Sequence, residues 1–107
     1  MTEETHYLLG MELFGDDDLD GAIREFQKAL ELKSGYGDVL HAIAMCYYHQ
    51  EKYKEAIEYG ERLRQEEPEN TLAYTSLSMF YNAQGMVAKA EEMGAKAGAA
   101  APPEESQ

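Results

Sequence analysis

Residues 37–70 read GDVLHAIAMCYYHQEKYKEAIEYGERLRQEEPEN, and the spacing of this stretch recurs on both sides of it. Its Ala56 lies 34 residues after Ala22 and 34 residues before Ala90. Other apolar residues that keep this register are Leu9, Ile43 and Leu77, and Met11, Met45 and Met79. A self-similar period of this length is typical of stacked helix–turn–helix arrays. Such arrays usually present a concave surface to another protein instead of carrying out chemistry.

The period divides the chain into three units, residues 3–36, 37–70 and 71–104, each of which predicts a pair of antiparallel helices. The six expected helices cover residues 3–14, 18–33, 38–49, 53–66 and 71–83, and a last segment that begins at residue 87. Gly35 is expected to stop the second helix, and Asn70 to cap the fifth. No alternating run of β-branched residues predicts a strand. We therefore expect one domain over residues 1–101 and a flexible tail over residues 102–107.

The residues in this register resemble the tetratricopeptide repeat family. That family expects a large aromatic residue, Leu with a small residue, Tyr, and a glycine near the turn, and then Ala, an aromatic residue, Ala and Pro. The third unit has Tyr74, Leu77, Ser78, Tyr81, Gly85, Ala90, Gly94, Ala97 and Pro102 at these places. Departures are His6 and Leu40 at the first aromatic place, and Gly60 and Gly94 at the second. The resemblance covers nearly the whole chain and implies an all-α, right-handed superhelical array of three repeats with six antiparallel helices and no strands.

The acidic composition restricts the partners of the chain. Its net charge of −12 disfavours nucleic acid and anionic membrane surfaces, which both attract basic proteins. The acids are expected to form a solvated outer surface, or else to attract a basic partner to the first half of the chain. Neither a signal-peptide pattern nor a stretch of about 20 apolar residues is present, so we expect a cytoplasmic protein without membrane insertion.

Apolar residues fade along the second helices of the three units. Ile23 and Leu30 of the first unit correspond to Glu91 and Gly98 of the third. A terminal repeat needs such a less apolar face to stay soluble. The fading predicts a complete three-repeat protein that is a monomer or a weak homodimer through its sixth helix.

Two patterns could indicate metal binding. Asp16, Asp18, Asp20 and Gly21 match the first half of a calcium loop, but Gln27 stands where that loop needs a bidentate Glu. The repeat register also needs this segment as a helix, so the acids are expected to stabilise a helix start and not to bind calcium specifically. Copper binding by methionines with His41, His49 or Cys46 is the other alternative. Cys46 is expected to be a buried core residue, and we predict no cofactor and no metal.

The resemblance also places a concave groove along the first helix of each unit. The residues expected to bind a partner there are Tyr7, Met11, Phe14, His41, Met45, Tyr48, His49, Leu72, Thr75, Met79 and Asn82. They are sulfur-containing, aromatic, aliphatic or weakly polar residues, on a molecule that is otherwise strongly acidic. Flexible methionine side chains suit a surface that accepts varied apolar shapes. The alternative is that the methionines pack between helices as ordinary core.

Some family members hold the carboxylate end of a chaperone tail with Lys, Arg and Asn side chains. The matching places here are Tyr7, Met11, Ala42, Leu72 and Ser76, so that activity is not expected. No arrangement of nucleophile, base and phosphate loop indicates an enzyme. The sequence therefore predicts an adaptor or assembly module that binds a protein or peptide partner through apolar anchors flanked by Lys or Arg. A chaperone-like protector of apolar segments, similar to three-repeat bacterial secretion chaperones, is the alternative, and metal or calcium binding is a remote one.

Overall fold

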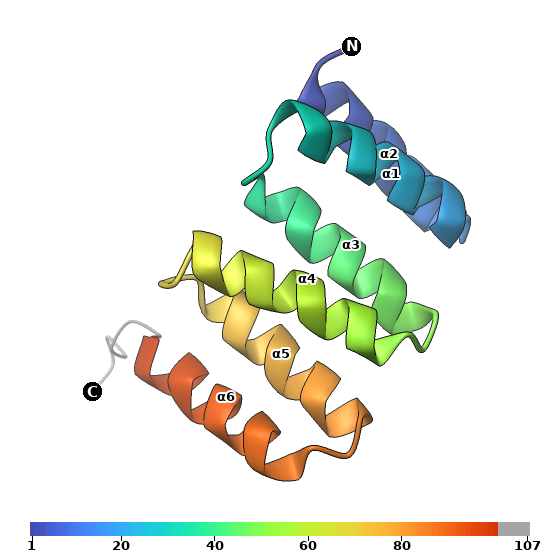
Figure 1. Cartoon of the computed structure of the whole chain (residues 1–107). Coiled ribbons are helices and arrows are strands. Elements are labelled where there is room, and N and C mark those ends of the chain that lie inside the picture. The colour runs from blue at the N-terminus through green and yellow to red at the C-terminus, as the bar shows by residue number, and fades with distance from the viewer. Residues whose placement is uncertain (101–107) are drawn as a thin grey trace, which may run out of the picture.

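Six helices make up the part of the chain described by the computed structural model, residues 1–100 (Figure 1). They are α1 (Glu3–Gly15), α2 (Leu19–Leu32), α3 (Gly37–His49), α4 (Tyr53–Glu66), α5 (Thr71–Ala83) and α6 (Val87–Ala100). No strand occurs within residues 1–100. The all-α repeat array predicted from the 34-residue register is confirmed. The expected tail, with Pro102 and Pro103, lies outside the described residues.

The helices follow one another as three antiparallel hairpins that stack along the length of the molecule (Figure 1). Each helix packs mainly against its neighbours in sequence, and α1 also touches α3. The array measures 44 × 31 × 23 Å. Because α1, α3 and α5 are the first helices of their hairpins, the α1–α3 contact places equivalent helices of two repeats side by side, and this positions the candidate site.

The turn inside each hairpin uses the same backbone conformation. Asp17, Glu51 and Gly85 have positive φ angles of 65°, 60° and 81°, and they are spaced by the repeat period. Asp18 then caps α2, because its Oδ1 accepts a hydrogen bond of 3.0 Å from the Gly21 N–H. The expectation that Gly35 stops α2 is wrong. The helix ends at Leu32, and the chain leaves it through Lys33 in an extended conformation, so no left-handed glycine is needed.

The repeat register identifies the core. Ala22, Ala56 and Ala90 are 0%, 0% and 1% exposed, so the helices can approach each other closely at these alanines. Cys46 is also buried, and burial raises the pKa of its thiol to about 12. Leu9 shares the register of the buried Ile43 and Leu77 but stays partly exposed.

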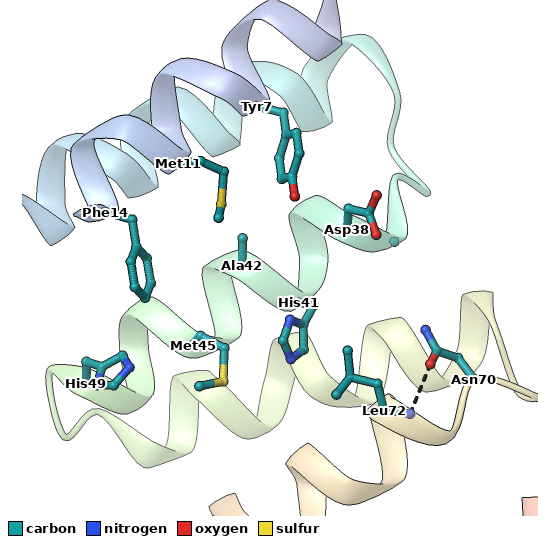
Figure 2. A pocket seen from close by; sticks show the side chains of 11 residues that line it. Tyr7, Met11, Phe14, Asp38, His41, Ala42, Met45, His49, Asn70 and Leu72 are labelled. Atoms are coloured by element: carbon teal, nitrogen blue, oxygen red, sulfur yellow. Dashed lines mark hydrogen bonds between the residues drawn. The ribbon is translucent and has the colours of Figure 1, made fainter. Parts of the chain in front are cut away.

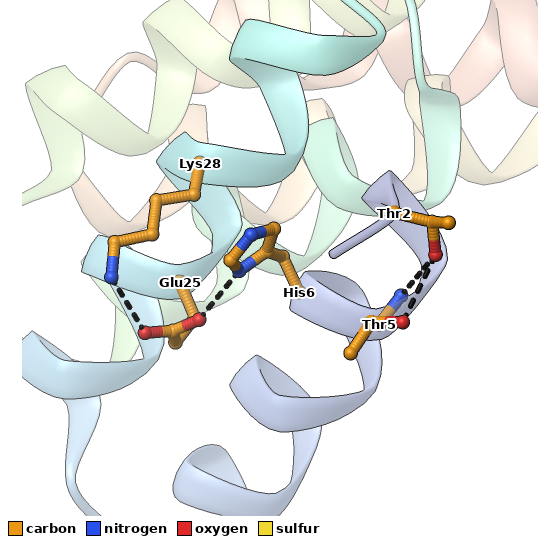
Figure 3. A network of polar contacts seen from close by, with 5 residues as sticks. All are labelled: Thr2, Thr5, His6, Glu25 and Lys28. Atoms are coloured by element: carbon orange, nitrogen blue, oxygen red, sulfur yellow. Dashed lines mark hydrogen bonds and ion pairs between the residues drawn. The ribbon is translucent and has the colours of Figure 1, made fainter.

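A polar network joins the first two helices at their outer side (Figure 3). His6 Nδ1 donates to Glu25 Oε1 at 2.8 Å, and Lys28 Nζ lies 3.1 Å from Glu25 Oε2. These hydrogen bonds from His6 and then Lys28 hold the pKa of the Glu25 carboxyl below its usual value. Thr2 caps α1 beside this network through the Thr5 N–H. His6 thus occupies the aromatic place of the first repeat as a link between α1 and α2.

Candidate groove formed by three first helices

A groove of about 390 Å³ lies between α1, α3 and the start of α5 (Figure 2). Seven of the residues expected to bind a partner line it: Tyr7, Met11, Phe14, His41, Met45, His49 and Leu72. Gly37, Asp38, Ala42 and Asn70 complete the lining. The wall is mostly apolar or aromatic, with polar groups at its edges.

The α1 wall of the groove consists of Tyr7, Met11 and Phe14. Their spacing of four and then three residues puts all three on one face of the helix. Figure 2 shows them pointing from α1 toward α3. The Tyr7 ring is supported from behind by Phe26 and Tyr36, at centroid distances of 6.1 and 5.5 Å. Met11 remains 41% exposed and therefore presents apolar surface to solvent.

Helix α3 forms the floor of the groove, with Asp38, His41, Met45 and His49 along one face. His41 Nε2 lies 3.2 Å from the Oγ of the buried Ser76 on α5. Burial lowers the pKa of the His41 imidazole, and the negative charge of Asp38 opposes this shift in part. Phe14 meets His49 edge to face, at a centroid distance of 5.7 Å, and closes one end. His41 is thus a neutral part of the floor near neutral pH.

The start of α5 supplies the third wall. Leu72 is 46% exposed and points into the groove beside Met45 and His41 (Figure 2). Asn70 fixes this helix start, because its Oδ1 accepts a 2.9 Å hydrogen bond from the Leu72 N–H and its Nδ2 donates to Glu67 Oε1. Asn70 was expected only as a cap, and the structure shows that the capping residue also lines the groove.

Four of the residues expected in the groove lie outside this lining: Tyr48, Thr75, Met79 and Asn82. The Tyr48 ring is 5.4 Å from the ring of the buried Phe80 and 5.7 Å from that of Tyr53. Tyr48 therefore packs over the core between α3, α4 and α5. The other three are exposed residues of α5, beyond the part of that helix that meets the groove.

Asp38 is the acidic residue of the groove lining. It lies three residues before His41 on α3, and this spacing puts both side chains on one helix face. The signal was thus available in the sequence. The sequence does not show, however, that Asp38 lies near Tyr7 and Tyr36, which come from other parts of the chain.

Residues of the calcium-loop pattern form hydrogen bonds with other parts of the chain. Asp18 accepts the Gly21 N–H, Asp20 Oδ1 accepts a 2.8 Å hydrogen bond from Gln50 Nε2, and Gln27 donates to the Tyr59 hydroxyl. Within residues 1–100, no three His, Cys, Asp or Glu side chains are arranged to hold a metal ion. In the same range, no helix is both long and apolar enough to cross a membrane.

Comparison with known proteins identifies the family of this array. The family model described as tetratricopeptide repeat matches residues 13–59 and 48–107. The chain belongs to the tetratricopeptide repeat family. Membership of this family agrees with the helix hairpins, the alanine register and the left-handed turn residue that recurs in each repeat. It places the chain among repeat arrays that present surfaces to other proteins.

Solved structures show the same arrangement of helices. A crystal structure of MamA is similar with a TM-score of 0.90 and 27% identity, over 92% of this chain and 58% of that one. The first tetratricopeptide domain of Spaghetti (RPAP3), bound to the HSP90 peptide SRMEEVD, has a TM-score of 0.89 and 15% identity, over 97% and 82%. YrrB, described as having an unusual peptide-binding site, has a TM-score of 0.87 and 22% identity, over 95% and 53%. This chain thus spans little more than half of the MamA chain. The comparison with curated proteins finds no match.

Proposed function

We propose that this groove binds an apolar segment of a partner protein, so that the chain acts as an adaptor or assembly module. The observation that carries the proposal is the exposure of large apolar side chains around one hollow. Met11 and Leu72 are 41% and 46% exposed, and both line the groove of about 390 Å³. Apolar side chains gathered in a concavity with a polar edge are typical of a binding site.

The lining suits side chains of varied shape. Met11 on α1 and Met45 on α3 both line the groove, and Figure 2 shows Met11 pointing toward α3 and Met45 lying on the side of α3 nearer Leu72. Unbranched thioether side chains adapt to different apolar partners. Phe14 and Tyr7 add aromatic surface, which often supplies binding free energy. An extended or helical segment with one or two large apolar side chains would bury this surface.

The acidic, carboxylate-terminated class of ligand does not fit this lining. The Spaghetti domain is bound to the peptide SRMEEVD. Here the residues at the places for carboxylate-binding cations are Tyr7, Met11, Ala42, Leu72 and Ser76, and none of the residues that line the groove is Lys or Arg. A peptide carboxylate in this groove would lose water without gaining a cationic partner. Apolar anchors are therefore the feature that a partner must supply.

A selection from a phage-displayed peptide library tests the proposal. Peptides selected by the unaltered protein should bind the double variant Met11→Ala/Leu72→Ala at least about tenfold more weakly in calorimetry, since central apolar anchors carry much of a binding free energy. Both side chains are substantially exposed, so the variant should keep its circular dichroism spectrum and midpoint of unfolding.

The matched control is Met86→Ala/Val87→Ala, which truncates two residues of similar exposure, 45% and 56%, at the start of α6. This control should bind the selected peptides as the unaltered protein does. An equal loss in both double variants, or a library from which no peptide is selected, would contradict the proposal.

A further inference from the structure

The groove has two chemically different ends. Phe14, Met45 and His49 lie at one end, and Tyr7 and Asp38 lie at the other (Figure 2). The Asp38 carboxylate brings a negative charge to the lining, which contains no Lys or Arg. Asp38 is exposed, and it takes part in none of the ion pairs formed by residues 1–100. A ligand therefore meets a carboxylate at one end and apolar surface at the other.

Two aromatic rings stand beside this carboxylate. The rings of Tyr7 and Tyr36 are 5.5 Å apart. Burial raises the pKa of both phenols, and the negative charge of Asp38 raises it further. An aromatic face beside a carboxylate is a favourable environment for an ammonium or guanidinium group.

Two further acidic residues lie near the Tyr36 ring. After burial and Asp38, the charges of Glu4 and Glu3 also raise the pKa of Tyr36. Both glutamates belong to the first turn of α1, as Asp38 belongs to the first turn of α3. The cation near these rings is Lys33, whose Nζ lies 4.7 Å from the centroid of the Tyr36 ring. The charge of this one ammonium is smaller than that of the three carboxylates that act on Tyr36, so the net charge at this end of the groove is negative.

We infer that the groove selects a segment in one orientation, with a Lys or Arg side chain beside Asp38 and Tyr7 and a large apolar side chain among Met11, Met45 and Phe14. The inference rests on the proposed function, because it assigns the ligand class and the direction of the ligand in the same groove. The carboxylate attracts the cation during approach and holds it over the Tyr7 ring. The apolar end removes the anchor from water. A reversed segment would place its cation against Phe14 and leave Asp38 without a partner.

The test uses synthetic peptides with acetylated and amidated ends, so that the termini carry no charge. Each peptide has one Leu or Phe anchor and one Lys, Arg, Gln or Glu at a defined distance before or after it, in an otherwise neutral background. Fluorescence anisotropy measures binding at low salt. The Lys and Arg peptides with the charge on one side of the anchor should bind about fivefold more tightly than the matching Gln peptides, and the Glu peptides should bind most weakly.

Variants separate the contribution of Asp38 from that of the total charge. Asp38→Asn should abolish the preference for Lys and Arg over Gln, and Asp38→Lys should reverse it, while the Leu and Phe anchors remain necessary. Glu58→Lys changes the net charge as Asp38→Lys does, but on the exposed side of α4. It should keep the preference. Circular dichroism should show all three variants folded.

The possible results distinguish the inference from the proposed function. If anchored peptides bind but show no preference for Lys or Arg, or if the preference survives in Asp38→Lys, the inference is wrong and the apolar groove remains. If the preference is equal on both sides of the anchor, the orientation is wrong. If no anchored peptide binds the unaltered protein, or if binding is unchanged in Met11→Ala/Leu72→Ala, the proposed function fails and the inference fails with it.

Discussion

At the scale of single residues, Gly10 shows how closely the first hairpin is packed. A Cβ atom on Gly10 would overlap the ring of Phe26, whose side chain is fully buried. The aromatic ring cannot move away without displacing the core around it. Gly10→Ala should therefore lower the free energy of unfolding by about 1–3 kcal/mol, as is typical of an overpacked core. Urea denaturation followed by circular dichroism measures this change.

Gly15 provides the control for this substitution. It belongs to the same helix, and a Cβ atom there would meet no other atom within 4 Å. Gly15→Ala should leave stability unchanged or raise it by up to about 1 kcal/mol, because alanine has the higher helix propensity. If both variants show the same stability, the packing of Phe26 on Gly10 is not as tight as described.

His41 provides a prediction about pH. Burial lowers the pKa of His41 in the folded state, so the unfolded chain binds its proton more readily. Stability contributed by this residue should therefore be present above the unfolded pKa of about 6.5 and decrease as pH falls through the window below it. An NMR titration should show one imidazole with a midpoint below about 6.5, and His41→Gln should remove that signal. A titrating signal at or above this value, assigned to His41, would contradict the burial described.

The orientation of Tyr48 illustrates why single side chains were harder to anticipate than the fold. The register alone puts Tyr48 three residues after Met45, on a face that equally suits the groove or the neighbouring helix. The choice depends on Phe80, which lies 32 positions further along and offers a ring to pack against. A repeat period does not encode such a contact between particular side chains of different repeats.

At the scale of helices, α6 is the element with the weakest sequence support. Its interior contains Gly94 and Gly98, and its buried side chains include Ala90 and Met93. A terminal helix with few buried contacts opens more easily than the rest of a repeat array. The backbone amides of α6 should therefore exchange with solvent faster than those of α3, in a hydrogen-exchange experiment on the unaltered protein.

A substitution in α6 tests whether the glycines cause this weakness. A Cβ atom on Gly98 would meet no other atom within 4 Å. Gly98→Ala should stabilise α6 by up to about 1 kcal/mol and slow its amide exchange by about fivefold. Gly85→Ala, in the turn before the same helix, should have the opposite effect, since Gly85 has a φ of 81°. Unchanged exchange in Gly98→Ala would show that lost packing, and not helix propensity, limits α6.

Helix boundaries show how far the sequence alone predicts where each helix begins and ends. The bounds expected for α4 and α5 agree with the structure, since Asn70 and the charged turn after Glu66 mark their ends clearly. The end of α2 differed because Gly35 resembles a helix stop, whereas the chain leaves the helix at Lys33 through extended backbone. Turn glycines can indicate a boundary without being the residue that makes it.

At the scale of the whole molecule, the 34-residue period was sufficient to predict the array. Contacts in such a fold occur mainly between helices adjacent in sequence, so a short repeated pattern specifies most of the packing. The groove was predictable only in part. Its floor follows from the spacing of His41, Met45 and His49 on one helix. Its third wall depends on how the start of α5, in the third unit, places Leu72 and the preceding Asn70 against the first two units.

The excess of acids makes a last prediction about the stability of the whole array. The chain has 21 Asp and Glu against 9 Lys and Arg, for a net charge of −12. Among residues 1–100, the His6–Glu25 pair joins two helices, while the other ion pairs connect residues three or four positions apart within one helix. Salt therefore screens repulsion throughout the molecule but breaks few contacts between helices.

Raising NaCl from about 0.01 M to about 0.1 M, which shortens the screening length from about 30 Å to about 10 Å, should increase the free energy of unfolding. Urea is the suitable denaturant because it is uncharged. Glu58→Lys, which brings the net charge from −12 closer to zero, should show a smaller increase than the unaltered protein. A stability that falls with salt would mean that attractive pairs outweigh the repulsion. In that case the acids of this surface would stabilise the array through specific partners instead of opposing its folding.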